Sequence, residues 1–265
     1  MKFEFVKMHG AGNDFVLFEM PSGAFPGAKA MHKLCDRRLG VGADGVLFVT
    51  HSSSKGVHAK MEYFNSDGKR AEMCGNGLRC AALYAHQRIG TPKTMKITTD
   101  AGVLEAKVTG RHHVTIQIPV VHEFRPKSLE IETVHFGDTG VPHAVIFVED
   151  VEGVNIVQWG ASIRNHPAFL PEGTNVNFVA LGPGKATARI RTYERGVEDE
   201  TFACGTGAAA SAICLREYQG LGDRIRLITI GKDVLEVEFP ADYNKIKRVS
   251  LTGPAVETFQ GTIDI

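Results

Sequence analysis

Residues 63 to 79 read Tyr-Phe-Asn-Ser-Asp-Gly-Lys-Arg-Ala-Glu-Met-Cys-Gly-Asn-Gly-Leu-Arg, and residues 193 to 209 read Tyr-Glu-Arg-Gly-Val-Glu-Asp-Glu-Thr-Phe-Ala-Cys-Gly-Thr-Gly-Ala-Ala. The tyrosine, the cysteine and both glycines of Cys-Gly-x-Gly recur 130 residues later. In each copy an aromatic residue typical of a strand and a polar turn precede the cysteine. This match predicts a tandem duplication with Cys74 and Cys204 at equivalent positions.

Each Cys-Gly-x-Gly leads into small and apolar residues, 78–85 and 208–215, which have the propensity of a buried helix. Both cysteines are therefore predicted to lie just before a helix N-terminus, where glycines let another group approach the backbone. The helix dipole favours a thiolate there and draws the pKa of a thiol below about 8.5. One such thiolate can take a proton near neutral pH, and an identical thiol can give one.

The other three cysteines have a simpler interpretation, because a lone cysteine is ordinarily a small buried hydrophobic residue. Cys35, Cys80 and Cys214 lie in apolar helical patterns, and we expect them to be structural. Five cysteines with no Cys-x-x-Cys spacing predict neither a disulfide framework nor a thioredoxin-like motif, as is typical of a reducing cytoplasm. The eleven histidines lack ligand spacing, so no metal site is expected.

The charge balance limits the class of partner. Thirty basic and thirty acidic residues cancel, and no basic stripe typical of a nucleic-acid binder is present in the sequence. Residues 1–10 carry interspersed charges, unlike a signal peptide, and no apolar run approaches the roughly 18 residues of a membrane span. These features predict a cytoplasmic protein with no nucleic-acid or membrane partner.

The order of elements predicts the fold class. Each half contains many short strands and few helices, which indicates an α/β (α+β) protein with two pseudo-symmetric domains. Each domain is expected to be a curved, mostly antiparallel sheet wrapped around the helix that follows its cysteine. We place the boundary at Pro119, giving domains of residues 1–118 and 119–252, with the C-terminal strand 253–265 joining the first domain.

At the cysteine motifs the sequence resembles the diaminopimelate epimerase family. The family pattern Asn-x-Asp-Gly followed by Cys-Gly-Asn-Gly-x-Arg is present at residues 65–68 and 74–79. Glu-Arg-Gly followed by Ala-Cys-Gly-Thr-Gly-Ala is present at residues 194–196 and 203–208. The opening Lys-Met-His-Gly-Ala-Gly-Asn-Asp-Phe of residues 7–15 and the closing Thr-Gly-Pro-Ala-Val of residues 252–256 extend the resemblance over nearly the whole chain.

The resemblance implies an isomerase that interconverts LL- and meso-diaminopimelate in lysine and peptidoglycan-precursor synthesis. It implies a diaminopimelate epimerase-like fold, commonly a homodimer, with neither pyridoxal phosphate nor metal, in which Cys74 and Cys204 act on opposite faces of the α-carbon. His143 would lie beside the cysteines as a supporting residue. The substrate-binding positions carried over from the family are Asn13, Asn65, Asn175, Glu194 and Arg195 through their side chains, and Gly75, Asn76, Gly205 and Thr206 through backbone N–H groups at the carboxylate.

Three positions depart from the family pattern. Lys69 stands where Ser usually follows Asp-Gly, and Gly45 and Val141 stand where many members carry Gln and Asn. The two cysteines are unaffected, so the departures bear on how the substrate is contacted. Loop glycine backbone or water are the alternatives for replacing the lost amides.

Three other functions fit parts of the pattern. The first is a related cofactor-independent racemase of the proline racemase type, against which the Asn-x-Asp-Gly and Glu-Arg-Gly elements argue. The second, the phenazine-biosynthesis isomerase type, lacks this cysteine pair. The third is a thiol redox or metal-binding protein, for which metal analysis of purified protein is the discriminating measurement.

Overall fold

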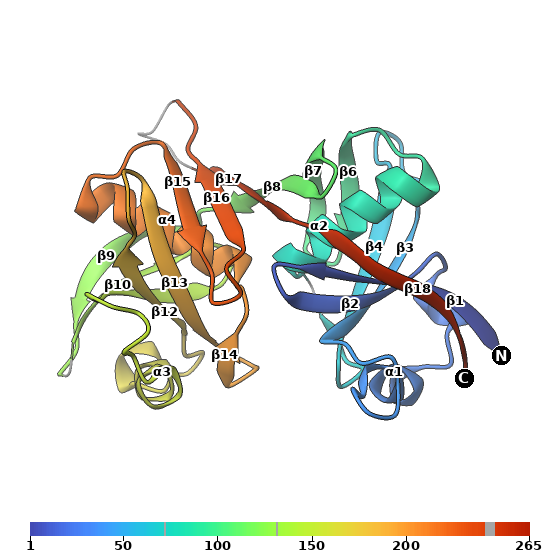
Figure 1. Ribbon diagram of the computed structural model, residues 1–265, viewed down its shortest axis with the longest axis horizontal. Helices are drawn as coiled ribbons and strands as arrows, with labels where there is room; N and C mark the ends of the chain where they lie inside the picture. The colour runs from blue at the N-terminus through green and yellow to red at the C-terminus, as the bar shows by residue number, and fades with distance from the viewer. Residues whose placement is uncertain (72, 131, 242–246) are drawn as a thin grey trace. The chain divides into compact units, whose positions relative to one another are not determined.

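Two units, each with its own buried helix, form the computed structural model, which describes residues 1–71, 73–130, 132–241 and 247–265. The first unit comprises Met1–Ile116 and Gly253–Ile265, and the second comprises Gln117–Thr252. The chain leaves the first unit within strand β8 and returns to it within strand β17 (Figure 1).

The elements of the first unit are β1 (Lys2–Gly10), β2 (Asn13–Phe18), α1 (Ala28–Cys35), β3 (Gly45–His51), β4 (Ala59–Asn65), β5 (Arg70–Ala71), α2 (Gly75–Tyr84), β6 (Thr94–Thr99), β7 (Gly102–Gly110), β8 (His113–Pro119) and β18 (Val256–Asp264). The first unit also contains a short 3-10 turn at Ser22–Ala24 and a π-helical extension of α2 at Ala85–Ile89. The strands pair antiparallel except at β2–β3 and β4–β6, where α1 and α2 provide the crossovers.

The elements of the second unit are β9 (His122–Ser128), β10 (Thr133–Asp138), β11 (Pro142–Phe147), α3 (Ile156–Arg164), β12 (Asn175–Leu181), β13 (Thr187–Glu194), β14 (Asp199–Thr201), α4 (Gly205–Gln219), β15 (Arg224–Ile228), β16 (Val234–Glu238) and β17 (Arg248–Pro254), with a 3-10 turn at Pro167–Phe169. Its parallel pairs, β11–β12 and β13–β15, follow the order of the first unit. The two units therefore repeat one topology, which confirms the predicted fold class.

The helices that follow the two cysteines lie at the centre of their own sheets. Residues 76–84 of α2 are all buried, and α2 packs against β1, β2, β3, β4 and β7. Residues 207–215 of α4 are likewise buried, and α4 packs against the strands of the second unit. Alanine and glycine fill these helices, and their small side chains let several strands approach the backbone closely. The sheets curve around them, as predicted.

The opposite face of each sheet is covered by the other helix of its unit. In the first unit Phe18, Phe25 and Phe48 stack between the strands and α1, with ring centroids 5.1 to 5.6 Å apart. In the second unit Ile146 and Phe178 pack with α3 in the same way. Because both faces are buried, the strands read as continuous apolar runs.

The strand registers correct the alignment of the two copies before the cysteines. Val46 pairs with Phe64, whereas its counterpart Val176 pairs with Tyr193, so Tyr193 matches Phe64 and not Tyr63. Equivalent residues of the two units are 129 positions apart at Phe64 and Tyr193 and 130 positions apart at the cysteines. The difference arises because the hairpin after β13 is one residue longer than the hairpin after β4. The tyrosines that recur 130 residues apart are therefore not structural equivalents.

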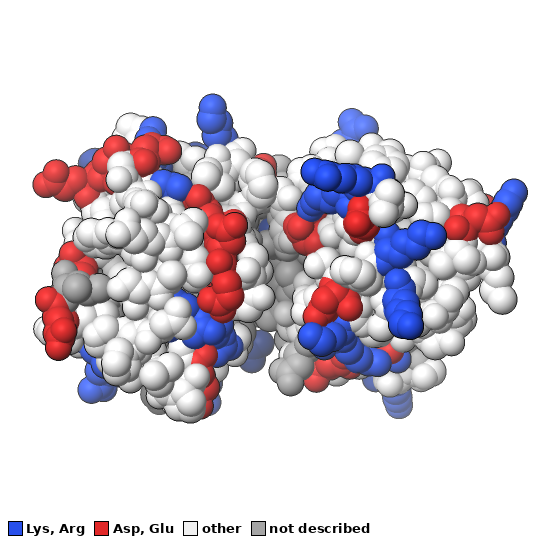
Figure 2. All heavy atoms as spheres, turned by 90° about the horizontal axis from the view of Figure 1, so that it is seen from below, with Lys and Arg blue, Asp and Glu red and all other residues white. Residues whose placement is uncertain are grey.

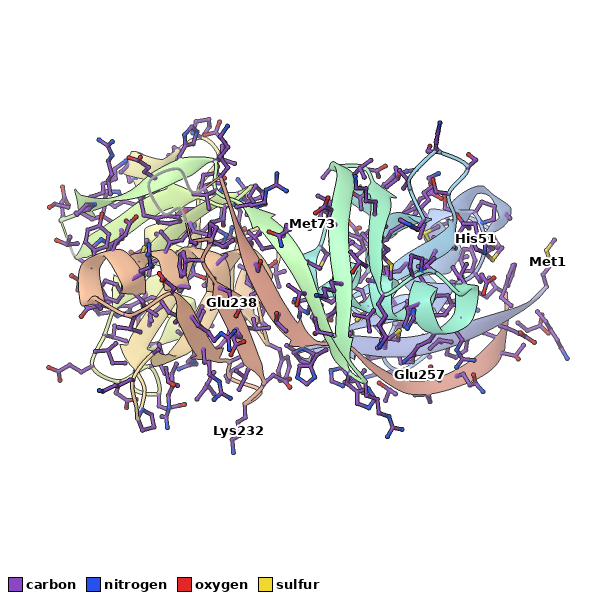
Figure 3. All side chains as sticks on the ribbon, turned by 90° about the horizontal axis from the view of Figure 1, so that it is seen from above. Met1, His51, Met73, Lys232, Glu238 and Glu257 are labelled. Carbon is purple, nitrogen blue, oxygen red and sulfur yellow. The ribbon has the colours of Figure 1, made fainter. Side chains whose placement is uncertain are left out.

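The C-terminal strand returns to the first unit. β18, dark red in Figure 1, pairs antiparallel with β1 from Lys2↔Asp264 to His9↔Val256. Glu257 near its start, labelled in Figure 3, accepts from Arg88 at 2.9 Å. The strand β9 pairs antiparallel with β10.

Charged side chains of both signs are found over each unit on the face drawn in Figure 2. This mixture agrees with the equal totals of acidic and basic residues. Within the described part of the chain no helix combines the length and the apolar character that crossing a membrane requires.

Candidate active site

Cys74 caps the N-terminus of α2. It follows Met73, labelled in Figure 3, and its extended backbone (φ −137°, ψ 121°) brings its Sγ to 3.5 Å from the Gly77 N–H. The first intrahelical bond runs from Leu78 N to Cys74 O at 2.8 Å. Gly75 and Asn76 therefore lie in the first turn, whose N–H groups have no acceptor within the helix and attract anions.

A series of hydrogen-bonded side chains lies beside the Cys74 thiol. Arg79, fully buried, donates to Asn76 Oδ1 at 2.8 Å, and Asn76 Nδ2 donates to Asn13 Oδ1 at 3.2 Å. Asn13 Nδ2 donates in turn to Asp44 Oδ2 at 2.7 Å, so the Asn13 oxygen faces Cys74 Sγ at 3.5 Å. The structure thus brings the predicted residues Asn13 and Asn76 to the cysteine.

The turn that carries Asn13 is anchored by a charge network. Asp14 binds Lys7 at 2.6 Å and Arg37 at 2.8 Å, and Arg37 also binds Asp44 at 2.7 Å. Burial alone would raise the pKa of Asp14, but the hydrogen bonds from Arg37 and Lys7 outweigh it and lower the pKa to about 2. The carboxylate is therefore charged near neutral pH and holds the turn in place.

Cys204 caps α4 in the same manner. Its backbone is extended (φ −113°, ψ 114°), and its Sγ lies 3.4 Å from the Gly207 N–H and 3.3 Å from Thr206 Oγ1. Gly205 and Thr206 occupy the first turn, as Gly75 and Asn76 do in the first unit. Thr139 donates to the Thr206 carbonyl at 3.0 Å and so ties the β10–β11 turn to this helix start.

His143 lies in a fully buried polar network of the second unit. Its Nδ1 is 3.1 Å from Asn177 Nδ2, and Asn177 Oδ1 accepts from Thr192 at 3.0 Å. Burial, assisted by the positive charge of Arg195, lowers the pKa of His143 to about 3, so the imidazole is neutral at pH 7. A Cβ on Gly207 would lie 2.3 Å from Asn177 Oδ1, which places this network against the first turn of α4.

Each of the remaining predicted binding residues lies at or next to the end of a strand in its own unit. Asn175 is buried and accepts from the Arg195 backbone N–H at 2.9 Å, while Glu194 accepts from Thr201 at 2.8 Å. The Arg195 guanidinium donates to the Glu172 carbonyl at 3.2 Å. Asn65 ends β4 and is exposed. It occupies the place that Glu194 occupies at the end of β13.

Two of the three departures from the family pattern have a clear structural context. The Lys69 side chain is exposed and pairs with Asp67 at 2.9 Å on the surface turn. A Cβ on Gly45 would lie 2.6 Å from the Phe64 carbonyl and 2.7 Å from the Tyr63 ring, so the Tyr63 ring covers this position. Val141 lies in the β10–β11 turn, two residues before His143.

The other three cysteines are buried thiols, as predicted. Burial raises the pKa of Cys35 and of Cys80 to about 12, and it raises the pKa of Cys214 well above its usual range. A thiol that stays protonated is a poor base and a poor nucleophile. Cys35, Cys80 and Cys214 are therefore not candidates for the acid–base role assigned to Cys74 and Cys204.

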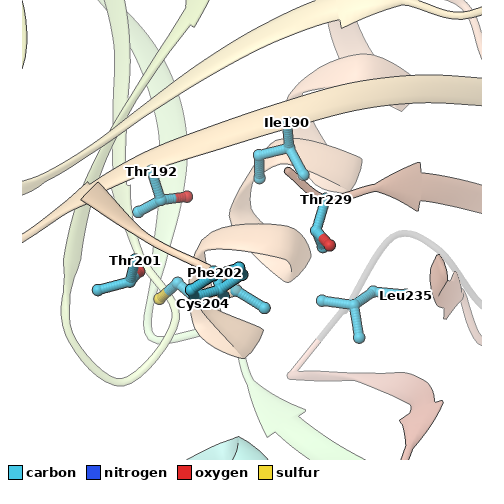
Figure 4. Close-up of a pocket in the computed structure, with 8 residues that line it drawn as sticks. Ile190, Thr192, Thr201, Phe202, Cys204, Thr229 and Leu235 are labelled. Carbon is cyan, nitrogen blue, oxygen red and sulfur yellow. The ribbon is translucent and has the colours of Figure 1, made fainter. Parts of the chain in front are cut away.

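A small hollow adjoins the second cysteine (Figure 4). It is lined by Thr192, Thr201 and Cys204 on one side and by Ile190, Thr229 and Leu235 on the other. Phe202, which is 58% exposed, also lines it. Among the described residues, no group of three or more His, Cys, Asp or Glu side chains is placed to hold a metal ion.

Sequence reasoning missed three residues that shape these sites. Asp44 and Asn177 are not among the predicted site residues, and Arg79 enters the sequence analysis only as the last residue of the motif at residues 74–79. Two of these residues could have been found from the sequence. A polar residue in an otherwise apolar strand, or a charged residue in a helix of small side chains, is rarely buried without hydrogen-bond partners.

The duplicated fold is shared with solved structures of low sequence identity. A phenazine biosynthesis protein of the PhzF family from Bacillus anthracis superposes with a TM-score of 0.75 at 15% identity, covering 100% of both chains. A hydroxyproline epimerase from Agrobacterium vitis superposes with a TM-score of 0.71 at 14% identity, covering 99% of this chain and 92% of the other. Fold and paired cysteine caps thus define the class of protein as a duplicated two-unit fold with one cysteine thiol at the N-terminus of each central helix.

Sequence comparison identifies the family within this class of protein. The diaminopimelate epimerase family model matches residues 5–121 and 136–257. A diaminopimelate epimerase from Aquifex aeolicus is 39% identical, covering 98% of this chain and 97% of the relative. One from Methanocella arvoryzae is 39% identical, covering 100% and 98%. The chain belongs to the diaminopimelate epimerase family and is an isomerase acting on a small molecule.

Proposed function

We propose that the protein interconverts LL- and meso-diaminopimelate by a two-cysteine acid–base mechanism without a cofactor. The observation that carries the proposal is the equivalence of Cys74 and Cys204. Both cap a buried central helix, and both accept from the N–H three residues on, at 3.5 and 3.4 Å. A near-symmetric pair of groups suits a reaction whose substrate and product differ only at one carbon.

The difficult step is removal of an α-hydrogen, because the resulting carbanion is poorly stabilised. First-turn N–H groups of Gly75, Asn76, Gly205 and Thr206 would bind the carboxylate, where charge develops in the transition state. One thiolate then takes the proton while the opposite thiol donates another, and the roles exchange in the reverse reaction. His143 is assigned a supporting part in this site.

The rest of the substrate needs polar partners for its amino and carboxylate groups. We assign Asn13, Asn65, Asn175, Glu194 and Arg195 to this task. Support comes from Asn13 beside Cys74 and from the contact between Asn175 and the Arg195 backbone. We further propose that the enzyme is a cytoplasmic homodimer, in keeping with the family.

The decisive experiment is an epimerisation assay of purified protein on LL-diaminopimelate in D₂O with no cofactor added. Deuterium should enter the α-position of the product because the donated proton comes from a thiol in exchange with solvent. Cys74→Ala and Cys204→Ala should each abolish turnover while keeping the wild-type circular dichroism. Activity on proline but not on diaminopimelate would favour the proline racemase alternative, and one inactive variant beside one fully active variant would refute the two-base scheme.

A further inference from the structure

The second unit contains a buried polar network that its repeat does not contain. His143, Asn177 and Thr192 are each 3% exposed or less. The strand registers give their counterparts in the first unit: Phe15 pairs with Gly45 as His143 pairs with Asn175, and Leu47 lies two residues after Gly45 as Asn177 lies two after Asn175. The first unit builds the same sheet with an aromatic and an aliphatic residue at these places. The fold therefore does not require the polar pair.

The orientation of the Asn177 amide is determined by its surroundings. Its Oδ1 accepts from the Thr192 hydroxyl at 3.0 Å, and its Nδ2 donates to the Ala144 carbonyl at 3.1 Å. A carbonyl can only accept, so the amide nitrogen must face Ala144. The same nitrogen lies 3.1 Å from His143 Nδ1.

This orientation decides the tautomer of the imidazole. An amide nitrogen can only donate, so a neutral His143 must accept at Nδ1 and carry its proton on Nε2. The Nε2 atom is buried and has no hydrogen-bond partner among the described residues. A buried donor without an acceptor is costly, and such donors are typical of sites that a ligand completes.

The network also lies in close contact with the first turn of α4, the helix that Cys204 caps. A side chain at Gly207 would collide with Asn177 Oδ1 at 2.3 Å, whereas a side chain at the equivalent Gly77 would make ordinary contacts, with a Leu47 methyl group at 3.4 Å and with Cys74 Cβ at 3.5 Å. Gly207 is also the residue whose N–H contacts Cys204 Sγ. The amide that orients His143 therefore lies directly beneath the turn that holds the thiol.

We propose that Asn177, held by Thr192, is a positioning residue that fixes His143 as the Nε2–H tautomer, so that the imidazole serves the active site as a hydrogen-bond donor and not as a base. A donor at this place would bind the substrate carboxylate or the thiolate form of a cysteine. The proposal rests on the proposed function for the meaning of the site, but the tautomer itself is a property of the resting protein.

The first test is ¹⁵N NMR of the histidine side chains in uniformly labelled full-length protein. His143 signals are identified by their loss in His143→Gln. Nδ1 should resonate as an unprotonated nitrogen and Nε2 as a protonated one. Asn177→Asp, whose carboxylate only accepts, should move the proton to Nδ1. A wild-type Nδ1–H tautomer, or an unchanged tautomer in Asn177→Asp, would overturn the proposal.

The second test measures turnover. Asn177→Asp and Asn177→Leu should lower kcat by about tenfold or more, with a smaller change in KM, because a histidine in the wrong tautomer cannot donate where it should. Thr192→Ser should keep the tautomer and most of the rate, whereas Thr192→Val should lose both in part. The matched control is Phe178→Leu, in the same strand but in the cluster facing α3, which should leave the tautomer unchanged.

The outcomes separate this proposal from the proposed function. Wild-type protein that epimerises nothing would refute the function, while the NMR tautomer would still be tested. Active wild-type protein with a reversed tautomer and an unchanged kcat in Asn177→Asp would refute the positioning role alone. If Asn177→Asp does not fold, the wild-type spectrum and the Thr192→Ser and Thr192→Val pair decide the question.

Discussion

At the scale of single residues, the surroundings of a side chain decide what it can do. Five cysteines share one chemistry, yet the half-buried Cys74 and the buried Cys204 cap helices, whereas burial raises the pKa of the other three thiols. His143 is likewise set apart from a surface histidine by complete burial, which lowers the pKa to about 3. Both contrasts give measurable consequences.

Alkylation should distinguish the two classes of cysteine. In native protein at pH 8, iodoacetamide is expected to modify Cys74 and Cys204 and to spare Cys35, Cys80 and Cys214, because burial raises the pKa of those three thiols. Peptide mass spectrometry reads the sites directly, and labelling in urea should reach all five. Early modification of Cys80 in folded protein would contradict this assignment.

His143 should make stability depend on pH. Its folded pKa, about 3, lies below the unfolded value of about 6.5, so the unfolded chain binds the proton more readily. The stabilisation is complete above pH 6.5 and falls as the pH drops toward 3, by about 1.4 kcal/mol per pH unit.

Urea unfolding at pH 7.5 and pH 5.5 measures this effect. His143→Gln should show a difference between the two pH values that is smaller by about 1 kcal/mol than in the wild type. Ile163→Val, a packing change in the α3 cluster, should lower stability equally at both. An unchanged pH difference in His143→Gln would show that another group is responsible.

At the scale of elements, the repeated helix starts differ in what lies beneath them. Gly77 lies over the Leu47 side chain, and Gly207 lies over the Asn177 amide. The second glycine of Cys-Gly-x-Gly is therefore expected to tolerate a side chain better in the first unit, at Gly77, than in the second unit, at Gly207. The difference arises from the strand below the helix and not from the helix itself.

Paired alanine substitutions test this difference. Gly207→Ala should destabilise the protein by about 2 kcal/mol, because the new Cβ meets a hydrogen-bonded amide that cannot move. Gly77→Ala should change stability by less than about 1 kcal/mol, since the contact is ordinary and alanine favours the helix. Equal free energies of unfolding for the two variants would contradict the explanation.

At the scale of the whole molecule, the first unit is built from both ends of the chain. β18 pairs with β1 from Lys2 to His9, with a register shift between Lys7 and Met8, and Arg88 of the α2 extension binds Glu257 on β18. The free edge of β1 would otherwise present unpaired backbone groups. The second unit, by contrast, is made of one continuous segment.

Deleting the residues after Ala255 should therefore unfold the first unit selectively. Hydrogen-exchange mass spectrometry is expected to show loss of protection in β1 and β2, with β12 and β13 still protected. A matched deletion of only the last residue, Ile265, should preserve protection in both units. Persistent protection of β1 without β18 would show that its pairing is dispensable.

The sequence by itself determined the family, the duplication, the fold class and the central cysteines. These follow from local patterns: Cys-Gly-x-Gly motifs, small-residue helices and glycine turns read the same in any context. The C-terminal strand is also expected from the sequence to join the first domain, and in the structure β18 pairs with β1.

Only the tertiary structure decided which residues of the two repeats are equivalent and which polar groups support the cysteines. The match of Tyr193 with Phe64 depends on hydrogen-bond register across strands, and a hairpin one residue longer changes it without a visible gap. The contacts of Asn76 with Asn13 and of Asn177 with His143 depend on distance through space. Such contacts join residues that the chain brings together only when the sheet closes around its helix.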